Sequence, residues 1–187
     1  MKKILSSVFV ILVLFVSGCS SDLSGTLENE PETRGEKEVE DVQLQVSKMD
    51  EEAGVTTENN EIYQYLDQMV KEDPKMGIPN DFSIHIVDIV EGYDDDTHAT
   101  ILFLGVNRLP KAMKNISFNY TLGTEDGEYM WKGVEVMLSE SEVGIIKPNH
   151  AVPYSLEITP EQEEIYMKLE QDNTIMNMEN FDFELVE

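Results

Sequence analysis

The chain has 187 residues, and its 38 acidic and 13 basic side chains give a formal net charge of -25 at pH 7. Such a charge disfavours nucleic acid as a partner, because nucleic acid also carries negative charge over a large surface. The chain contains one cysteine, which excludes an intramolecular disulfide and leaves no thiol pair for metal or redox chemistry.

The first 18 residues have the pattern of a secretory signal segment. Lys2 and Lys3 form a basic start, and an apolar core follows from residue 4 to residue 16. This core is shorter than the roughly 20 apolar residues that a membrane-spanning helix needs. We therefore interpret residues 1–18 as a cleaved signal peptide rather than a permanent anchor helix.

The end of this segment, Val16-Ser17-Gly18-Cys19, resembles the lipobox of bacterial lipoproteins. The resemblance implies that Cys19 is alkylated with a diacylglycerol and becomes the first residue of the mature protein. Two long acyl chains hold a protein on a bilayer without a membrane-spanning helix. The expected location is the extracytoplasmic face of the cell membrane, with the membrane itself as one partner.

Acids, serine, threonine and glycine dominate the residues that follow Cys19, and residues 20–60 contain no aromatic side chain. Such a composition buries too little apolar surface to offset the entropy of the chain. We predict an acidic, disordered linker over residues 19–58. Val42, Leu44 and Val46 alternate with polar residues, which leaves a short strand or a docking segment as the alternative.

The folded domain is predicted to span residues 59–187 and to begin with a helix. Asn59 or Asn60 is the expected N-cap, and Asp73-Pro74 ends the helix. The apolar stripe is expected to pack against a sheet, although two tyrosines near its start leave a partner-binding surface as the alternative. The stripe consists of Ile62, Leu66, Met69 and Val70.

After a turn at residues 79–81 the periodicity changes from helix to strand. Runs rich in β-branched and aromatic residues are separated by turn residues at intervals of about ten positions. The Asp126-Gly127 pair and the acidic residues 91–96 mark hairpins. The stretch Thr159-Pro160-Glu161-Gln162 predicts a second short helix through residue 170. The predicted strands are residues 82–90, 97–106, 116–122, 133–138, 152–158 and 181–186.

This order of elements predicts a mainly β fold, an antiparallel β-sandwich with one or two short helices. Over residues 80–187 the order resembles the immunoglobulin-like domains of uncharacterised Gram-positive lipoproteins. The resemblance rests on the strand Ile116-Ser117-Phe118-Asn119-Tyr120 and on the turns at Asp126-Gly127 and Pro148-Asn149. It implies an immunoglobulin-like sandwich that lacks the cysteine pair of antibody domains. A resemblance in fold implies no particular activity.

Catalytic motifs are missing from the sequence. The chain has no Gly-x-Ser-x-Gly nucleophile elbow, no His-Glu-x-x-His spacing and no glycine-rich phosphate loop. His85, His98 and His150 lack a motif that would make one of them a general base. We predict that the protein is not an enzyme. Among the functions considered, a hydrolase of cell-wall polymers ranks last. Such enzymes use a pair of carboxylates, and with 38 acidic residues the sequence cannot single out one pair.

The acidic run Asp94-Asp95-Asp96, followed by His98, is the weak candidate for a metal site. Calcium takes about six to eight oxygen ligands, which adjacent carboxylates and backbone carbonyls supply in part. The alternating acids of an EF-hand are missing, so an acidic hairpin turn is the preferred interpretation. Asp126 and Glu128 around Gly127 form a similar, weaker pair.

The leading hypothesis for function is a non-enzymatic binding or accessory module that contacts an envelope protein or an exported ligand. It rests on a long predicted tether, a compact domain and the lack of a catalytic motif. Tyr93, Tyr129 and Trp131 are the candidate contact residues, because Tyr and Trp are enriched at interface hot spots. Core packing explains Trp131 equally well. The alternative function is an acidic envelope protein that binds divalent cations.

Overall fold

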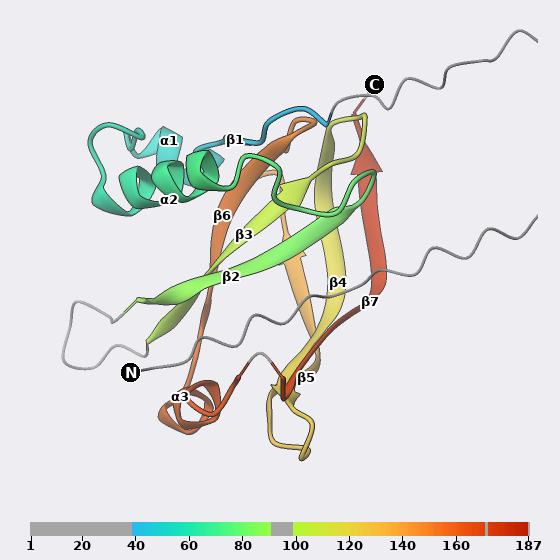
Figure 1. The fold of residues 1–187 in the computed structure, drawn as a ribbon. Coiled ribbons are helices and arrows are strands. Elements are labelled where there is room, and N and C mark those ends of the chain that lie inside the picture. The colour runs from blue at the N-terminus through green and yellow to red at the C-terminus, as the bar shows by residue number, and fades with distance from the viewer. Residues whose placement is uncertain (1–38, 91–98, 171, 187) are drawn as a thin grey trace, which may run out of the picture. The chain divides into compact units, whose positions relative to one another are not determined.

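The computed structural model describes residues 39–90, 99–170 and 172–186. In this part of the chain the strands form two sheets that pack face to face (Figure 1). Sheet A contains, in spatial order, β1 (Gln43–Leu44), β6 (His150–Glu157), β3 (Thr100–Asn107) and β2 (Phe82–Val90). Sheet B contains β5 (Tyr129–Leu138), β4 (Met113–Thr124) and β7 (Thr174–Leu185). The predicted mainly β sandwich is confirmed.

Six of the described strands follow the order found in immunoglobulin-like sandwiches. β2, β3 and β6 correspond to immunoglobulin strands A, B and E, and β5, β4 and β7 correspond to C′, C and F. These strands pair antiparallel, whereas the short β1 pairs with β6 in parallel. Among the described residues, no strand takes the place of immunoglobulin strand G, which lies beside F.

The strands predicted between residues 82 and 186 are all present. β2 has the predicted limits, and β4 and β5 are joined at the predicted Asp126-Gly127 turn. The largest difference is β7, which begins at Thr174 instead of residue 181. Its first half pairs with β4 from Thr174 onward, and the polar residues Asn177, Glu179 and Asn180 obscured this extension in the sequence.

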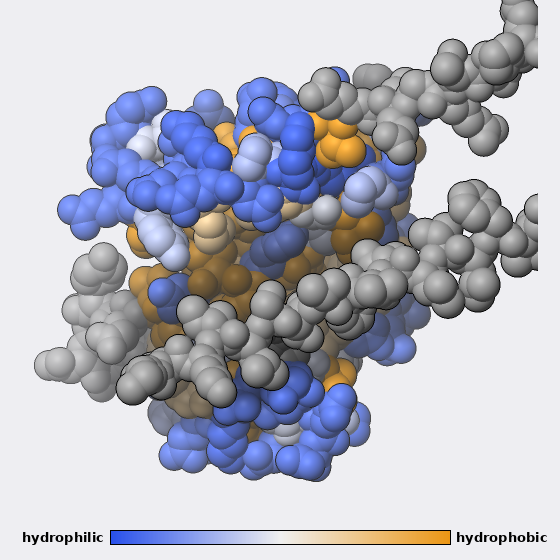
Figure 2. Space-filling model, in the orientation of Figure 1, coloured by the Kyte–Doolittle hydropathy of each residue, from blue (hydrophilic) through white to orange (hydrophobic). Residues whose placement is uncertain are grey.

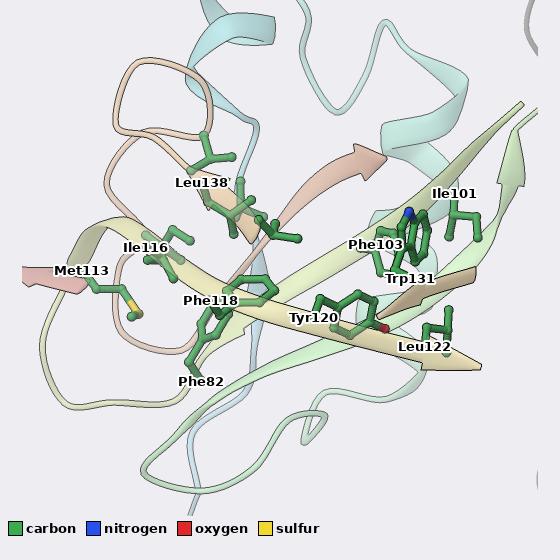
Figure 3. Close-up of a cluster of buried hydrophobic side chains, with 14 of the residues drawn as sticks. Phe82, Ile101, Phe103, Met113, Ile116, Phe118, Tyr120, Leu122, Trp131 and Leu138 are labelled. Carbon is green, nitrogen blue, oxygen red and sulfur yellow. The ribbon is translucent and has the colours of Figure 1, made fainter. Parts of the chain in front are cut away.

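The main core lies between the sheets and is rich in aromatic side chains (Figure 3). Phe103 of β3 is fully buried and stacks on Tyr154 of β6, with ring centroids 5.1 Å apart. Tyr120 meets the Phe103 ring edge-on at 5.9 Å, and Trp131 lies 6.1 Å from it. Aromatic pairs at such distances add to the stabilisation that burial of their area provides.

A second core lies between α2 (Glu61–Glu72) and the outer face of sheet A. Leu66 and Val70 of α2 pack in one buried cluster with Leu102 and Leu104 of β3. Sheet packing is therefore confirmed as the role of the apolar stripe, and Asn60 is the N-cap. Because β3 has a core on each of its faces, its sequence is a continuous apolar run rather than an alternating one.

The predicted disordered linker over residues 19–58 is corrected for the described residues 39–58. This part contains β1 and α1 (Lys48–Glu52), so the ordered domain begins before residue 59. Val42 is buried and its N–H donates to the carbonyl of Pro74, while the Gln45 N–H donates to the carbonyl of Ala151. The composition of the segment predicted disorder wrongly, because its order comes from backbone hydrogen bonds to segments that are distant in the sequence.

Arg108, at the end of β3, holds this N-terminal segment in place. It is only 5% exposed, and its guanidinium donates to the carbonyl oxygens of Glu40 (2.6 Å), Pro74 (3.2 Å) and Met76 (2.8 Å). It also donates to Oδ1 of Asn149 at 3.1 Å. One buried cation thereby joins three segments that are far apart in the sequence.

The approach of the chain to Arg108 requires a glycine at position 77. Gly77 has φ +88°, a conformation that residues with a Cβ rarely adopt. A Cβ there would lie 2.9 Å from Cγ1 of Val106 and 3.2 Å from Cγ of Arg108. The turn that carries the Met76 carbonyl to the guanidinium is therefore specific to glycine.

We expect the half-buried His85 on β2 to make the domain less stable in mild acid. Burial of the imidazole lowers its pKa below 6.5, against a weaker opposing effect of Asp73. As the pH falls below about 6.5, the unfolded chain binds the proton first, so stability present at neutral pH is lost. Urea unfolding of the wild type and of His85→Gln between pH 7.5 and pH 5 measures this loss.

The His85→Gln variant is expected to lose less stability over the same pH range, because glutamine does not titrate. The carboxylates titrate in both proteins, and their contribution cancels when the two pH profiles are subtracted. Identical profiles for the two proteins would contradict the assignment to His85.

Candidate binding surface

Several candidate residues lie outside the described part of the chain. These are Cys19, Tyr93, Asp94, Asp95 and Asp96. The lipidation of Cys19, the contact role of Tyr93 and the weak calcium site at the acidic run therefore stay predictions.

The two other candidate contact residues lie near the start of β5 in different environments. Tyr129 is half-buried, with Nζ of Lys132 4.5 Å from the centroid of its ring. Trp131 is 7% exposed and packs against Phe103 and Tyr120 in the main core. Trp131 is therefore a core residue, as the alternative interpretation of the sequence predicted, and its buried indole presents little surface to a partner.

The weaker acidic pair lies at the β4–β5 hairpin. Gly127 has φ +92° and its N–H donates to the carbonyl of Thr124, as the turn interpretation predicts. Glu128 forms an ion pair with Lys168 at 2.8 Å. Within residues 39–90, 99–170 and 172–186, no group of three or more His, Cys, Asp or Glu side chains is placed to hold a metal ion.

The structure reveals a different candidate at the open side of the sandwich where β2 and β7 are the outermost strands. Apart from the buried Phe82, the side chains of these two strands that pack against the main core are only half-buried, whereas those of β3 and β4 are almost fully buried. We name this region the β2–β7 surface and define it by Ile84, Ile86, Met178, Phe181 and Phe183.

The aromatic side chains of the β2–β7 surface are held in a fixed arrangement. Phe181 stacks on the buried Phe82 of β2, with centroids 5.5 Å apart and planes inclined by 15°. Phe183 lies 5.2 Å from Phe181. Figure 2 shows that apolar residues gather across the middle of the face that carries β2, between hydrophilic ends. A preformed apolar surface of this kind binds with little loss of conformational entropy.

The outer positions of β7 are acidic. Glu179, Asp182 and Glu184 are exposed and alternate roughly with the apolar residues of the strand. Glu184 has a cation nearby, since its Oε2 lies 4.0 Å from Nζ of Lys114. The β2–β7 surface therefore combines an apolar floor with a negatively charged rim.

The opposite open side, between β5 and β6, is partly covered. A hollow of about 340 Å³ there is lined by Val136, Leu138 and Leu156, and α1 lies against it through Met49 and Asp50. The Met49 N–H donates to the carbonyl of Glu142, which fastens α1 over this side. Its covering makes this side a poorer candidate than the β2–β7 surface.

A second hollow, of about 500 Å³, lies between the N-terminal segment and the loop before β6. Lys48, Lys147, Glu51 and Glu140 line it, and Glu140 is paired with Lys114 at 2.7 Å. The lysine ammonium and its hydrogen bond lower the pKa of the Glu140 carboxyl. Charges of both signs are mixed here, and they do not converge on one kind of ligand.

Sequence reasoning missed the β2–β7 surface, although it identified the strand that carries it. Phe181 and Phe183 alternate with Asp182 and Glu184, which indicates one apolar and one charged face. The same alternation fits a central strand whose apolar face is fully covered. The position of β7 at a sheet edge depends on pairing with β4, which the local pattern does not encode.

No protein-family model matches the chain, and no curated protein is similar to it. One solved structure, described as the X-ray structure of Northeast Structural Genomics Consortium target SoR45, is 12% identical in sequence with a TM-score of 0.29. The similarity covers 59% of this chain and 86% of that one, and a likeness at this level carries no inference about function.

Among the described residues, no helix has the length and apolar character that crossing a bilayer requires.

Proposed function

We propose that this protein is a lipid-anchored extracytoplasmic lipoprotein that acts as a non-enzymatic binding or accessory module. In this proposal the anchor is a diacylglycerol on Cys19, and the β2–β7 surface holds a segment of an envelope or exported polypeptide. The observation that carries the binding role is the half-buried aromatic and aliphatic floor between β2 and β7. Location rests on the resemblance of residues 16–19 to a lipobox.

The binding role has a simple energetic basis. The half-buried side chains still expose apolar area, and a partner that covers this area stabilises the complex by about 25 cal/mol per Å². The ring positions are already fixed by stacking, so little order has to be gained on binding. Contiguous apolar surface with a polar rim is typical of interaction sites on soluble domains.

The proposal is tested by photo-crosslinking in intact cells with a photoreactive phenylalanine analogue at position 183. The matched control carries the analogue in place of Tyr65, which is 52% exposed on α2, away from the β2–β7 surface. We expect a defined, stoichiometric protein adduct from position 183 and none from position 65. No adduct at position 183, or the same adducts from both positions, would overturn the binding role.

Two further measurements test the anchor. Mass spectrometry of membrane-extracted protein is expected to show an N-terminal Cys19 with a diacylglycerol, and an unmodified Met1 or bare Cys19 would contradict this. Cys19→Ala is expected to release the protein from the membrane and to reduce the adduct from position 183. The cation-binding alternative predicts heat on titration with calcium chloride, which the binding module does not require.

A further inference from the structure

The free edge of β7 presents backbone hydrogen-bonding groups. Within the described chain β7 pairs only with β4. The Glu125 N–H donates to the carbonyl of Asn173, and residues of an antiparallel pair alternate between facing their partner and facing away. The N–H and C=O groups of Thr174, Met176 and Met178 therefore face away from β4. The Thr174 N–H agrees with this alternation, because it donates to the carbonyl of Glu170 and not to β4.

Two features limit what can pair with this edge. Asn180 has φ +53° and lies where the register between β7 and β4 shifts, so the regular part of the edge ends just before it. Exposed acids occupy positions 179, 182 and 184. Bulges and charges of this kind prevent indiscriminate pairing of edge strands.

The negative charge of β7 favours one kind of partner strand over another. A second copy of this chain would place the acids of one β7 beside those of the other, and like charges across a strand pair are destabilising. A strand with Lys or Arg at its outward positions would instead meet Glu179 at the end of the regular edge and, where it runs past Asn180, Asp182 and Glu184. Its intervening apolar side chains would face Met178, Phe181 and Phe183 on the β2–β7 surface.

We propose that the partner of this protein adds an extended strand to the free edge of β7, in the place that strand G occupies in immunoglobulin domains. The added segment belongs to another exported or envelope polypeptide and alternates apolar with basic residues. This inference rests on the proposed function, because it uses the β2–β7 surface. In strand addition, main-chain hydrogen bonds provide affinity and alternate side chains provide specificity.

Proline at position 178 tests the hydrogen bonds directly. Met178→Pro removes an N–H that faces away from β4, and proline is tolerated at an edge strand when its missing N–H lies on the open side. Met178→Val keeps the N–H and is the matched control. Thermal unfolding of both variants establishes that they fold before binding is compared.

The first measurement repeats the crosslinking from position 183 in these two backgrounds. Met178→Pro is expected to reduce the adduct by about tenfold, the effect of losing one well-formed hydrogen bond, whereas Met178→Val retains it. An adduct that survives Met178→Pro overturns strand addition and leaves the proposed function standing. If the unaltered protein gives no adduct from position 183, both proposals fail.

The second measurement needs no natural partner. The probe is the blocked peptide Lys-Val-Lys-Val-Lys-Val-Lys-Val, and its controls are the Glu-Val repeat and a peptide with four lysines followed by four valines. Hydrogen exchange of the full-length protein in detergent reports on the amides of Met176 and Met178. We expect the alternating basic peptide alone to slow their exchange. Equal protection by the three peptides, or protection by none, would overturn the assigned pattern.

Discussion

Replacing Arg108 with leucine is expected to lower the free energy of unfolding by about 3–5 kcal/mol, because several buried acceptors lose a charged donor at once. The carbonyl of Met76 would lose its donor, the carbonyl of Pro74 would keep only the Val42 N–H, and Glu40 would lose its tie to the sheet. Urea unfolding of the wild type and variant measures the difference. Hydrogen exchange should also show faster exchange in residues 40–53.

Lys111→Leu is the matched control for the Arg108 substitution. Lys111 is exposed a few residues further along the chain, so its replacement should change stability by less than about 0.5 kcal/mol. Arg108→Lys keeps the charge but not the planar fork of donors, and an intermediate loss is expected. If Arg108→Leu and Lys111→Leu unfold alike, the carbonyl contacts of Arg108 contribute nothing to stability.

Phe103→Ala is expected to destabilise the domain by a similar amount, about 3–5 kcal/mol, because a fully buried ring leaves a cavity between the sheets. Phe103 contacts Tyr120 of β4, Trp131 of β5 and Tyr154 of β6, so its loss removes packing from strands of both sheets. Urea unfolding again provides the measurement, with the single tryptophan of the chain as its fluorescent reporter.

The matched control for this cavity is Tyr120→Phe. Tyr120 is 1% exposed, and its hydroxyl has no hydrogen-bond partner in the described part of the protein. Burial raises the pKa of this hydroxyl well above its usual value, so it stays neutral. Removing it should leave stability unchanged or raise it by about 1 kcal/mol. A loss comparable to that of Phe103→Ala would show that cavity formation is not the dominant effect.

The features that could be predicted from the sequence are those encoded by neighbouring residues. Asn60 caps α2, and Thr159 with Gln162 forms the capping box of α3 (Pro160–Tyr166). The Asp126-Gly127 turn joins β4 to β5 as expected. Strand alternation gave the fold class for the same reason, because periodicity reports which face of an element is buried.

The features that could not be predicted depend on contacts between distant segments. Nothing around Val42 indicates that it pairs with the α2–β2 turn, or that a buried arginine more than sixty residues later fixes the preceding Glu40. The β2–β7 surface was missed because alternation shows that Phe181 and Phe183 share a face, but not that β7 is an outermost strand. Trp131 shows the converse, since an aromatic residue near a turn proved to belong to the core.

The tie between the N-terminal segment and β6 also bears on when the chain folds. Asn149 donates to the carboxylate of Glu40 across 109 residues, and β1 pairs with β6 over a comparable span. Sandwiches built from such distant pairs close slowly, in about milliseconds to seconds, because a long loop must be ordered first. In a chain translocated N-terminus first, the N-terminal segment would therefore stay undocked until β6 had emerged.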